Sequence, residues 1–391
     1  MRRCGWALLV AALVASGCSD GAEPQAQRVD RLVVVGDGGR VVTIAPDGSD
    51  PVVISDEAGS AAFQPLWSPD ATRIAWGSIG DQMGLAVAEV ASTEITFTEM
   101  ASNPFYLSWS PAGDRIGLLR NDGDGLAFET ATIGAEETVV TMVDSGQPYY
   151  FDWRPDGERL VTHVGSDRFD VIGDDGAIAE TGLEPGLFLA PQWIDRGIVS
   201  AVASSGGGEI VIATETGDTE SIAGFTGWGS FAADPSGDHL AFYSFPLDNG
   251  GVSVALVEDT LPEGVLTVID LDDGTVQEVT DGPVLAFQWS PDGEHLLVLG
   301  TEGDEGDLRW SVWTDDTLTV GPEFSPVRTW VRDYLPFHDQ YDRSMSLWSP
   351  DGETFAFPGV IDGQTGIWIH DVAAATTEFV IEGSWVVWSP V

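Results

Sequence analysis

The sequence predicts an all-β fold in which four-stranded repeats form a ring, and three observations predict it. A tryptophan followed by a Ser-Pro-Asp-Gly type of turn recurs along the chain. The recurrences at Trp67, Trp109, Trp153 and Trp193 lie 40 to 44 residues apart. The residues between them are patterned as short strands, with no helical periodicity after the N-terminal leader. A period of about 40 residues with strand-forming units is typical of a β-propeller, in which each repeat is one blade.

Each repeat reads as four strands. In the first repeat an apolar inner strand ends at Trp67, and residues 68–71 turn the chain. Proline presets φ at the first corner of such a turn, and aspartate bonds its own backbone. Two apolar strands, 73–76 and 84–90, and a more polar strand, 93–97, complete the repeat. We expect the large tryptophan to pack between neighbouring blades rather than to bind a ligand.

The two ends of the chain predict how the ring closes. Residues 32–54 read as three strands that lack an inner tryptophan strand, and residues 384–390 supply one. A blade built from both ends would remove an open sheet edge. The other inner strands lie near Trp67, Trp109, Trp153, Trp193, Ala233, Trp289 and Trp348. A single propeller of eight blades is therefore predicted. Seven blades are the alternative, should the Trp193 or the Ala233 repeat not form a full blade.

The repeat resembles the TolB-type propeller repeat, a WD-repeat-like unit marked by Trp-Ser-Pro-Asp-Gly before an apolar strand. Trp289 and Trp348 begin full copies of that motif. The resemblance covers nearly all of the chain beyond residue 31 and implies one propeller domain, residues 32–391. It implies little about chemistry, because propellers host many unrelated functions.

Residues 1–17 are typical of a signal peptide, since two arginines precede an apolar stretch too short to span a bilayer. The residues before Cys18 resemble a bacterial lipobox, although Ala15 stands where leucine is usual. We predict lipidation of Cys18 and a polar tether over residues 18–31, with ordinary cleavage near Ser16 as the alternative. The protein would then be exported and anchored to the bacterial cell membrane, on its periplasmic or extracellular face.

The charge of the chain is strongly negative. It carries 63 acidic residues and 16 basic ones, all of them arginine, for a formal net charge of −47. Such a surface repels phosphate backbones, so nucleic-acid binding is not expected. The acidity indicates either a salt-tolerant solvated surface or attraction for cations and basic partners.

Acidic turns raise a calcium hypothesis. Asp122 and Asp124 place two carboxylates two residues apart around a glycine, and residues 270–274 and 303–307 are similar. Carboxylates that converge in this way suit Ca²⁺. Asp-Gly pairs are also the ordinary chemistry of hairpin turns. We therefore predict no cofactor, and keep Ca²⁺ at Asp122 and Asp124 as the weaker alternative.

A search for catalytic motifs predicts no catalytic residue. Similar propellers precede the hydrolase domain of prolyl-oligopeptidase-like peptidases. The one Gly-x-Ser-x-Gly match in the chain, residues 17–21, lies at the end of the leader and not on the strand–turn–helix that such a domain requires. The five histidines show no metal-ligand spacing.

Two repeats are longer than the period, and insertions in repeat proteins usually lie on one face. One excess falls in residues 246–264. The other, between Trp289 and Trp348, is rich in aromatic residues and arginine, which are typical interface anchors. The predicted partner-binding residues are Arg328, Trp330, Arg332, Tyr334 and His338. In the alternative interpretation, this insertion folds over its own blades and its arginines pair with Asp333, Asp339 and Asp342.

The sequence therefore predicts a non-enzymatic, membrane-tethered binding or scaffold protein. Its partner would be an envelope protein or polymer, and the chain itself a monomer. The alternative is a hydrolase or lyase with an unrecognised site in the central channel of the propeller.

Overall fold

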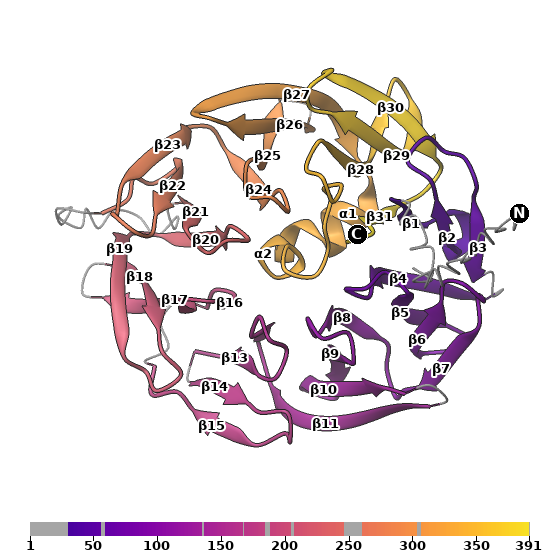
Figure 1. Ribbon diagram of the computed structural model, residues 1–391, viewed down its shortest axis with the longest axis horizontal. Coiled ribbons are helices and arrows are strands. Elements are labelled where there is room, and N and C mark those ends of the chain that lie inside the picture. The colour runs from indigo at the N-terminus through magenta and orange to yellow at the C-terminus, as the bar shows by residue number, and fades with distance from the viewer. Residues whose placement is uncertain are drawn as a thin grey trace, which may run out of the picture.

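The computed structural model describes residues 30–390, apart from 56–58, 135–136, 167, 184–187, 205–206, 246–259 and 303–305. The chain forms a closed ring of blades around a central channel (Figure 1). Six sheets have four strands, and a seventh sheet of seven strands joins two neighbouring blades. The ring therefore has eight blades, which confirms the predicted fold and excludes the seven-bladed alternative.

The first blade contains, from the channel outward, β31 (Trp385–Trp388), β1 (Leu32–Val35), β2 (Val41–Ile44) and β3 (Val52–Ser55), with a 3-10 turn η1 (Asp37–Gly39) between β1 and β2. The second contains β4 (Ser60–Trp67), β5 (Arg73–Gly80), β6 (Gly84–Glu89) and β7 (Ile95–Glu99). The third contains β8 (Pro104–Trp109), β9 (Arg115–Asp122), β10 (Gly125–Ile133) and β11 (Thr138–Gly146). The fourth contains β12 (Tyr149–Trp153), β13 (Leu160–Val164), β14 (Arg168–Ile172) and β15 (Ile178–Glu180).

The fifth blade contains β16 (Gln192–Ile194), β17 (Gly197–Ser204), β18 (Gly207–Ala213) and β19 (Thr219–Phe225). The sixth contains β20 (Trp228–Ala233), β21 (His239–Phe245), β22 (Leu266–Asp270) and β23 (Val276–Thr280). The seventh contains β24 (Val284–Trp289), β25 (Leu296–Glu302), β26 (Asp307–Thr314) and β27 (Thr317–Pro326). The eighth contains β28 (Thr354–Ile361), β29 (Gln364–Asp371) and β30 (Thr376–Ile381).

The first blade is built from both ends of the chain, as predicted. Strand β31 pairs antiparallel with β1, so that Leu32 faces Trp388 and Val35 faces Trp385. All residues of both strands are buried. Each of these apolar strands thus covers an edge that the other would leave open.

The recurring Ser-Pro-Asp turn is held by its own side chains. In the second blade the Ser68 hydroxyl donates to the Asp70 carboxylate at 2.6 Å, and the same carboxylate accepts the Thr72 amide at 3.1 Å. The Arg73 amide donates to the Ser68 hydroxyl oxygen at 2.9 Å. These bonds satisfy turn backbone that would otherwise lack partners, which explains why the motif recurs.

Inner-strand tryptophans join neighbouring blades, as expected. The Trp153 indole N–H donates to the Ser108 carbonyl at 3.2 Å, and the Arg115 guanidinium lies over the Trp153 ring at 5.3 Å. The Trp289 indole likewise donates to the Ala232 carbonyl of the preceding blade at 3.0 Å. Each ring thus fills a blade interface and hydrogen-bonds across it.

Buried glutamines form a second connection between blades. The Gln192 side-chain amide donates to the Phe231 carbonyl at 2.9 Å and accepts the Ala233 amide at 2.8 Å. Gln64 binds both backbone groups of Leu107 in the same way, and Gln288 binds Met345 and Leu347. We call this two-bond contact with the next inner strand a glutamine clamp.

The expectation of no helix beyond the leader is wrong in one place. Residues 327–345, which we call the plug, contain α1 (Arg328–Asp333), η2 (Leu335–Phe337) and α2 (His338–Tyr341). Both α-helices are too short to show a helical period, and packing rather than propensity holds them. The plug interrupts the inner strand of the eighth blade. Residues 325–326 pair with one end of β28 before it, and Trp348 bridges Phe355 after it.

Candidate functional site

The plug lies in the central channel of the ring, and not over its own blades. Figure 1 shows α2 near the centre, with the inner strands around it. The plug contacts all seven of the other blades. In blade order the contacts are Tyr341 with Trp385, Ser344 with Gln64, Gln340 with Tyr106, Arg343 with Asp152, Asp339 with the Ala190 backbone, His338 with Ser230, and Met345 with Gln288. The insertion is therefore part of the core of the ring.

Two of the five predicted partner-binding residues are buried in this core. Trp330 is 1% exposed and Tyr334 is 2% exposed. Their rings stack on each other at 5.1 Å, and Trp330 also packs against Trp310. Neither side chain is open to a partner in this conformation, so both stabilise the plug.

The other three predicted residues differ in their surroundings. Arg328 and Arg332 are exposed. The Arg332 guanidinium binds both carboxylate oxygens of Asp333, at 2.6 and 2.5 Å. His338 faces the channel wall, where its Nε2 lies 3.2 Å from the Ser230 hydroxyl. The pairing of Arg332 with Asp333, which the alternative interpretation predicted, is thus present. The predicted residues do not form one patch.

An ion pair holds the end of the plug. The Arg343 side chain binds the Asp152 carboxylate at 3.2 Å, and the same carboxylate accepts the Trp193 amide at 2.7 Å. Asp152 precedes the inner-strand tryptophan of its blade, the position that Gln192 and Gln288 hold in theirs. A carboxylate lacks the donor of a glutamine clamp, and it offers a negative charge to the plug instead.

Burial shifts the titration of the groups around this pair. It raises the pKa of Asp152, against the opposing effect of Arg343. It also raises the pKa of Asp342 to about 7, against a hydrogen bond from Gln288 and the charge of Arg343. Burial opposes the charge of Arg343, but the carboxylates of Asp152 and Asp342 outweigh it and raise the pKa of the guanidinium. Removal of carboxylates from water favours their neutral form.

A pocket of about 330 Å³ opens beside the plug, where the inner strands β8 and β12 begin. Its walls are mainly aromatic: Phe63, Phe105, Tyr106, Tyr149, Tyr150, Phe188, Phe337 and Tyr341. Its polar lining residues are Gln147, Arg332, Asp333 and Gln340. We call it the aromatic pocket. Sequence reasoning missed it, since its residues come from separate repeats.

A second pocket, of about 260 Å³, lies where the same inner strands end. Its lining includes Trp153, Asp195, Asp234 and Arg343, so it is more polar than the aromatic pocket. Gln340 lines the first pocket and Arg343 lines the second. The plug therefore extends between the two ends of the inner strands and separates two faces of different chemistry.

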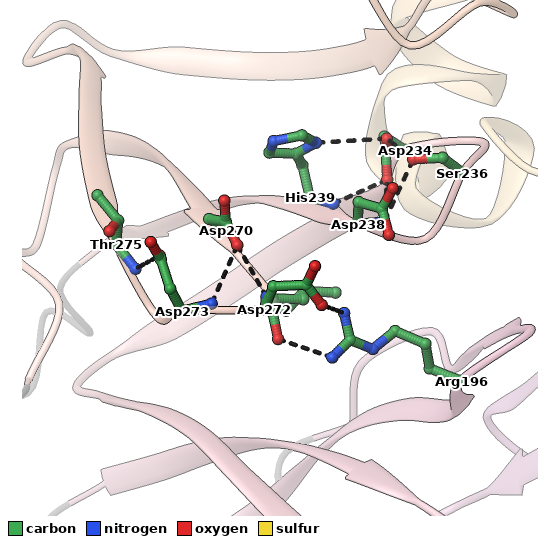
Figure 2. A network of polar contacts seen from close by, with 10 residues as sticks. Arg196, Asp234, Ser236, Asp238, His239, Asp270, Asp272, Asp273 and Thr275 are labelled. Carbon is green, nitrogen blue, oxygen red and sulfur yellow. Dashed lines mark hydrogen bonds and ion pairs between the residues drawn. The ribbon is translucent and has the colours of Figure 1, made fainter.

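The acidic turns use their carboxylates to hold backbone. Figure 2 shows Asp270 accepting the amides of Asp272 and Asp273, at 2.8 and 3.1 Å, and Asp273 accepting the amide of Thr275. Arg196 of the neighbouring blade binds Asp272 at 2.7 Å. Ordinary hairpin chemistry accounts for these contacts.

The calcium hypothesis at Asp122 and Asp124 gains no support from the geometry. Asp122 lies 3.4 Å from the Arg120 guanidinium. Among the residues that the structure describes, no group of three or more His, Cys, Asp or Glu side chains could hold a metal ion.

The predicted signal peptide and Cys18 lie outside the described residues, as does most of the predicted tether and residues 246–259 of the other insertion. Within the described part, no helix has both the length and the apolar character to cross a membrane. The expectations for the N-terminal segment stay predictions.

Comparison with solved structures shows the same fold. Dihydro-heme d1 dehydrogenase NirN in complex with DHE has a TM-score of 0.61 at 14% identity, over 91% of this chain and 74% of that one. A eukaryotic initiation factor has a TM-score of 0.57 at 10% identity, over 93% and 99%. The β-propeller domain of the trilobed protease from Pyrococcus furiosus has a TM-score of 0.51 at 13% identity, over 84% and 98%. This chain is a β-propeller.

These comparisons do not select a function. TolB from Acinetobacter baumannii is also similar, at a TM-score of 0.43 and 13% identity over 86% of this chain and 68% of that one, which is too distant to carry an argument. No family model and no curated protein matches the chain. A dehydrogenase and an initiation factor share the fold, so function must be argued from the site.

Proposed function

We propose that this protein is a non-enzymatic, exported and membrane-tethered propeller that binds a protein partner through the face on which the aromatic pocket opens. One observation carries the proposal. Phe337 of the plug lines that pocket and is 49% exposed, and Val331, the chain neighbour of the lining residue Arg332, is 44% exposed. Exposed apolar groups rimmed by polar ones mark interaction surfaces. An envelope polymer is the other candidate partner.

The enzyme alternative has less support. A hydrolase or lyase site was expected in the central channel. The plug lies in that channel (Figure 1), and its side chains Trp330, Tyr334 and Tyr341 are buried. The tyrosines carry pKa values raised by burial, so their hydroxyls stay protonated and are poor bases.

A capture experiment tests the proposed surface. The tagged full chain, incubated with envelope extract and a cross-linker, with and without added calcium, should retain a defined protein. Val331→Ser with Arg332→Ala should reduce its yield at least about tenfold, or about 1.4 kcal/mol. Val320→Ser is the matched control, because Val320 is 62% exposed on the outer strand β27. Equal capture by all three chains would refute the surface.

The membrane tether has a separate test. Cys18→Ser removes the thiol that lipidation requires, so the variant should leave the membrane fraction for the soluble one. Wild-type chain should remain with membranes after a high-salt wash. A Cys18→Ser chain that still sediments with membranes would contradict the lipid anchor. It would not contradict the proposed partner surface.

A further inference from the structure

The aromatic pocket has the dimensions of a small-molecule site. Its volume of about 330 Å³ lies at the lower end of the range for ligand sites, roughly 300 to 1,000 Å³. The wall comes from the second, third and fourth blades, from Phe188 ahead of β16, and from the plug. A pocket between several packed elements is largely preformed, so a ligand need not order it.

Aromatic rings dominate the wall. Tyr150 and Phe188 stack at 4.5 Å with an angle of 14° between their planes. Phe337, from the plug, is half exposed at 49%. The hydroxyls of Tyr106 and Tyr341 donate to backbone carbonyls at 3.0 and 2.8 Å, which fixes the orientation of both rings. The face of an aromatic ring attracts a cation.

The charges around the pocket also favour a cation. Arg332 is the one cationic residue among the described lining residues, and Asp333 binds its guanidinium with both oxygens. Asp339 is close enough to Tyr150 to raise the pKa of that phenol further, after the larger effect of burial. The whole chain has a formal net charge of −47. The charges of the lining itself cancel, so the attraction for cations comes from the net charge of the whole chain.

One buried donor faces no acceptor. Gln340 lines the pocket, is 5% exposed, and its side-chain Nε2 has no hydrogen-bond partner among the described residues. A buried amide donor left without a partner costs about 1–3 kcal/mol. Nearly all buried donors in folded proteins are paired. This nitrogen is closed off in the present conformation, so a rotation of the Gln340 side-chain amide must bring it to an oxygen of a bound molecule.

We propose that the aromatic pocket binds a small organic cation that carries an oxygen acceptor, of the quaternary-ammonium alcohol or betaine class. The alkylated ammonium group lies against the aromatic wall formed by Tyr150, Phe188 and Phe337. The oxygen accepts a hydrogen bond from Gln340 Nε2 once the side-chain amide has rotated toward the pocket. This site needs no protein partner, so it stands apart from the proposed function.

Three probes test the two parts of the proposal on the full chain by titration calorimetry. Choline contains both features, 3,3-dimethylbutan-1-ol is its neutral isostere, and tetramethylammonium lacks the oxygen. Choline should bind at least about tenfold more tightly than the neutral alcohol. It should also bind roughly three- to tenfold more tightly than tetramethylammonium. Equal affinity for choline and the neutral alcohol, or no binding of choline at about 10 mM, overturns the proposal.

Two variants assign the contacts. Gln340→Leu removes the donor at similar volume, so it should abolish the preference for choline over tetramethylammonium. Because it also removes an unpaired buried group, its thermal midpoint should stay the same or rise. Phe188→Leu should weaken choline at least about fivefold and leave the neutral alcohol unchanged. Phe245→Leu, at a ring 43% exposed on β21, is the matched control. A Gln340→Leu chain that keeps the preference contradicts the proposal.

Discussion

At the scale of single residues, one substitution within the repeat explains how the plug is held. Asp152 stands where the fifth and seventh blades have a glutamine before the tryptophan. The Arg343 guanidinium forms an ion pair with the Asp152 carboxylate at 3.2 Å. Buried ion pairs are costly to break from one side, because the remaining charge stays in a poor solvent. The pair therefore fixes the position of the end of the plug relative to the inner strand of the fourth blade.

A double-mutant cycle measures that constraint. Arg343→Met should lower the free energy of unfolding by about 1–3 kcal/mol, because it leaves the Asp152 carboxylate without its counter-charge; the loss is smaller than for a fully buried pair because the Arg343 side chain is 26% exposed. Asp152→Asn should cost less than Arg343→Met, because burial already disfavours the charged form of this carboxyl. The double variant Asp152→Asn with Arg343→Met should cost less than the two single changes added together, since no charge is left alone. Urea unfolding of the four chains gives the coupling, and strictly additive losses would show that the pair is not coupled.

Asp342 predicts a dependence of stability on pH. Its folded pKa is about 7, against an ordinary value of about 3.9. The folded state therefore binds more protons than the unfolded state between these values, and this group removes stability as pH rises from about 4 to about 7. Asp152 and Asp339, whose pKa values are also raised, act in the same direction. His338, whose pKa is lowered, acts in the opposite direction below about 6.5.

The difference between wild type and Asp342→Asn isolates the contribution of Asp342. The variant should gain about 1–3 kcal/mol of unfolding free energy at pH 8 and little at pH 4, because it removes a charge that burial disfavours. Urea titrations at the two pH values supply the comparison. An equal effect at both pH values would show that the carboxyl does not titrate in this window.

At the scale of elements, the glutamine clamps connect inner strands that no sheet pairing joins. Gln192→Leu should lower the free energy of unfolding by about 2–4 kcal/mol, since it leaves the Phe231 carbonyl and the Ala233 amide buried without their partner. Gln364→Leu, at an exposed position on β29, should cost less than about 0.5 kcal/mol. Chemical denaturation of both variants tests this prediction. Similar losses of unfolding free energy would show that the clamp does not stabilise the ring.

The sequence could predict the elements that repeat and not those that occur once. The spacing of Trp67, Trp109 and Trp153 recurs, so one physical explanation served many blades. The helices of the plug have six and four residues, and burial of rings such as Trp330 holds them. A sequence window of that length holds no periodic signal. The composition of the insertion did mark it as unusual, though not where it would lie.

The aromatic pocket lay beyond sequence reasoning for a different reason. Phe105, Tyr150, Phe188 and Gln340 come from different repeats, and the curvature of the ring brings them together. Likewise, Asp152 and Arg343 are 191 residues apart. Such pairs carry no local pattern. The signal that was available was the carboxylate at Asp152, where two other repeats have glutamine.

At the scale of the whole molecule, closure depends on one short strand. Deletion of residues 384–391 removes β31, whose four buried residues include Trp385 and Trp388 at 2% and 3% exposure. Each large apolar side chain contributes about 1.5–3 kcal/mol by burial, and the total approaches the stability of an ordinary domain. The truncated chain should lose cooperative thermal unfolding or melt far below the full chain.

A circular permutant is the matched control for closure. The Ser389 amide donates to the Arg31 carbonyl at 2.8 Å, so residues 30 and 390 are close enough to join. New ends at the exposed turn after Asp362 would leave every blade intact. Calorimetry should give this permutant a thermal midpoint near that of the wild type. If the truncated chain had the same thermal midpoint as the wild type and the permutant, β31 would be dispensable.

The shared first blade has a consequence for synthesis. The ribosome makes β1 before every other strand of the ring and β31 after them, so β1 waits for its inner partner until all the other strands have been made. Its four residues, Leu32 to Val35, are aliphatic and would expose an unpaired edge throughout that time. Such an edge pairs readily with other chains. Nascent copies should therefore need a chaperone that covers β1 until β31 has been made.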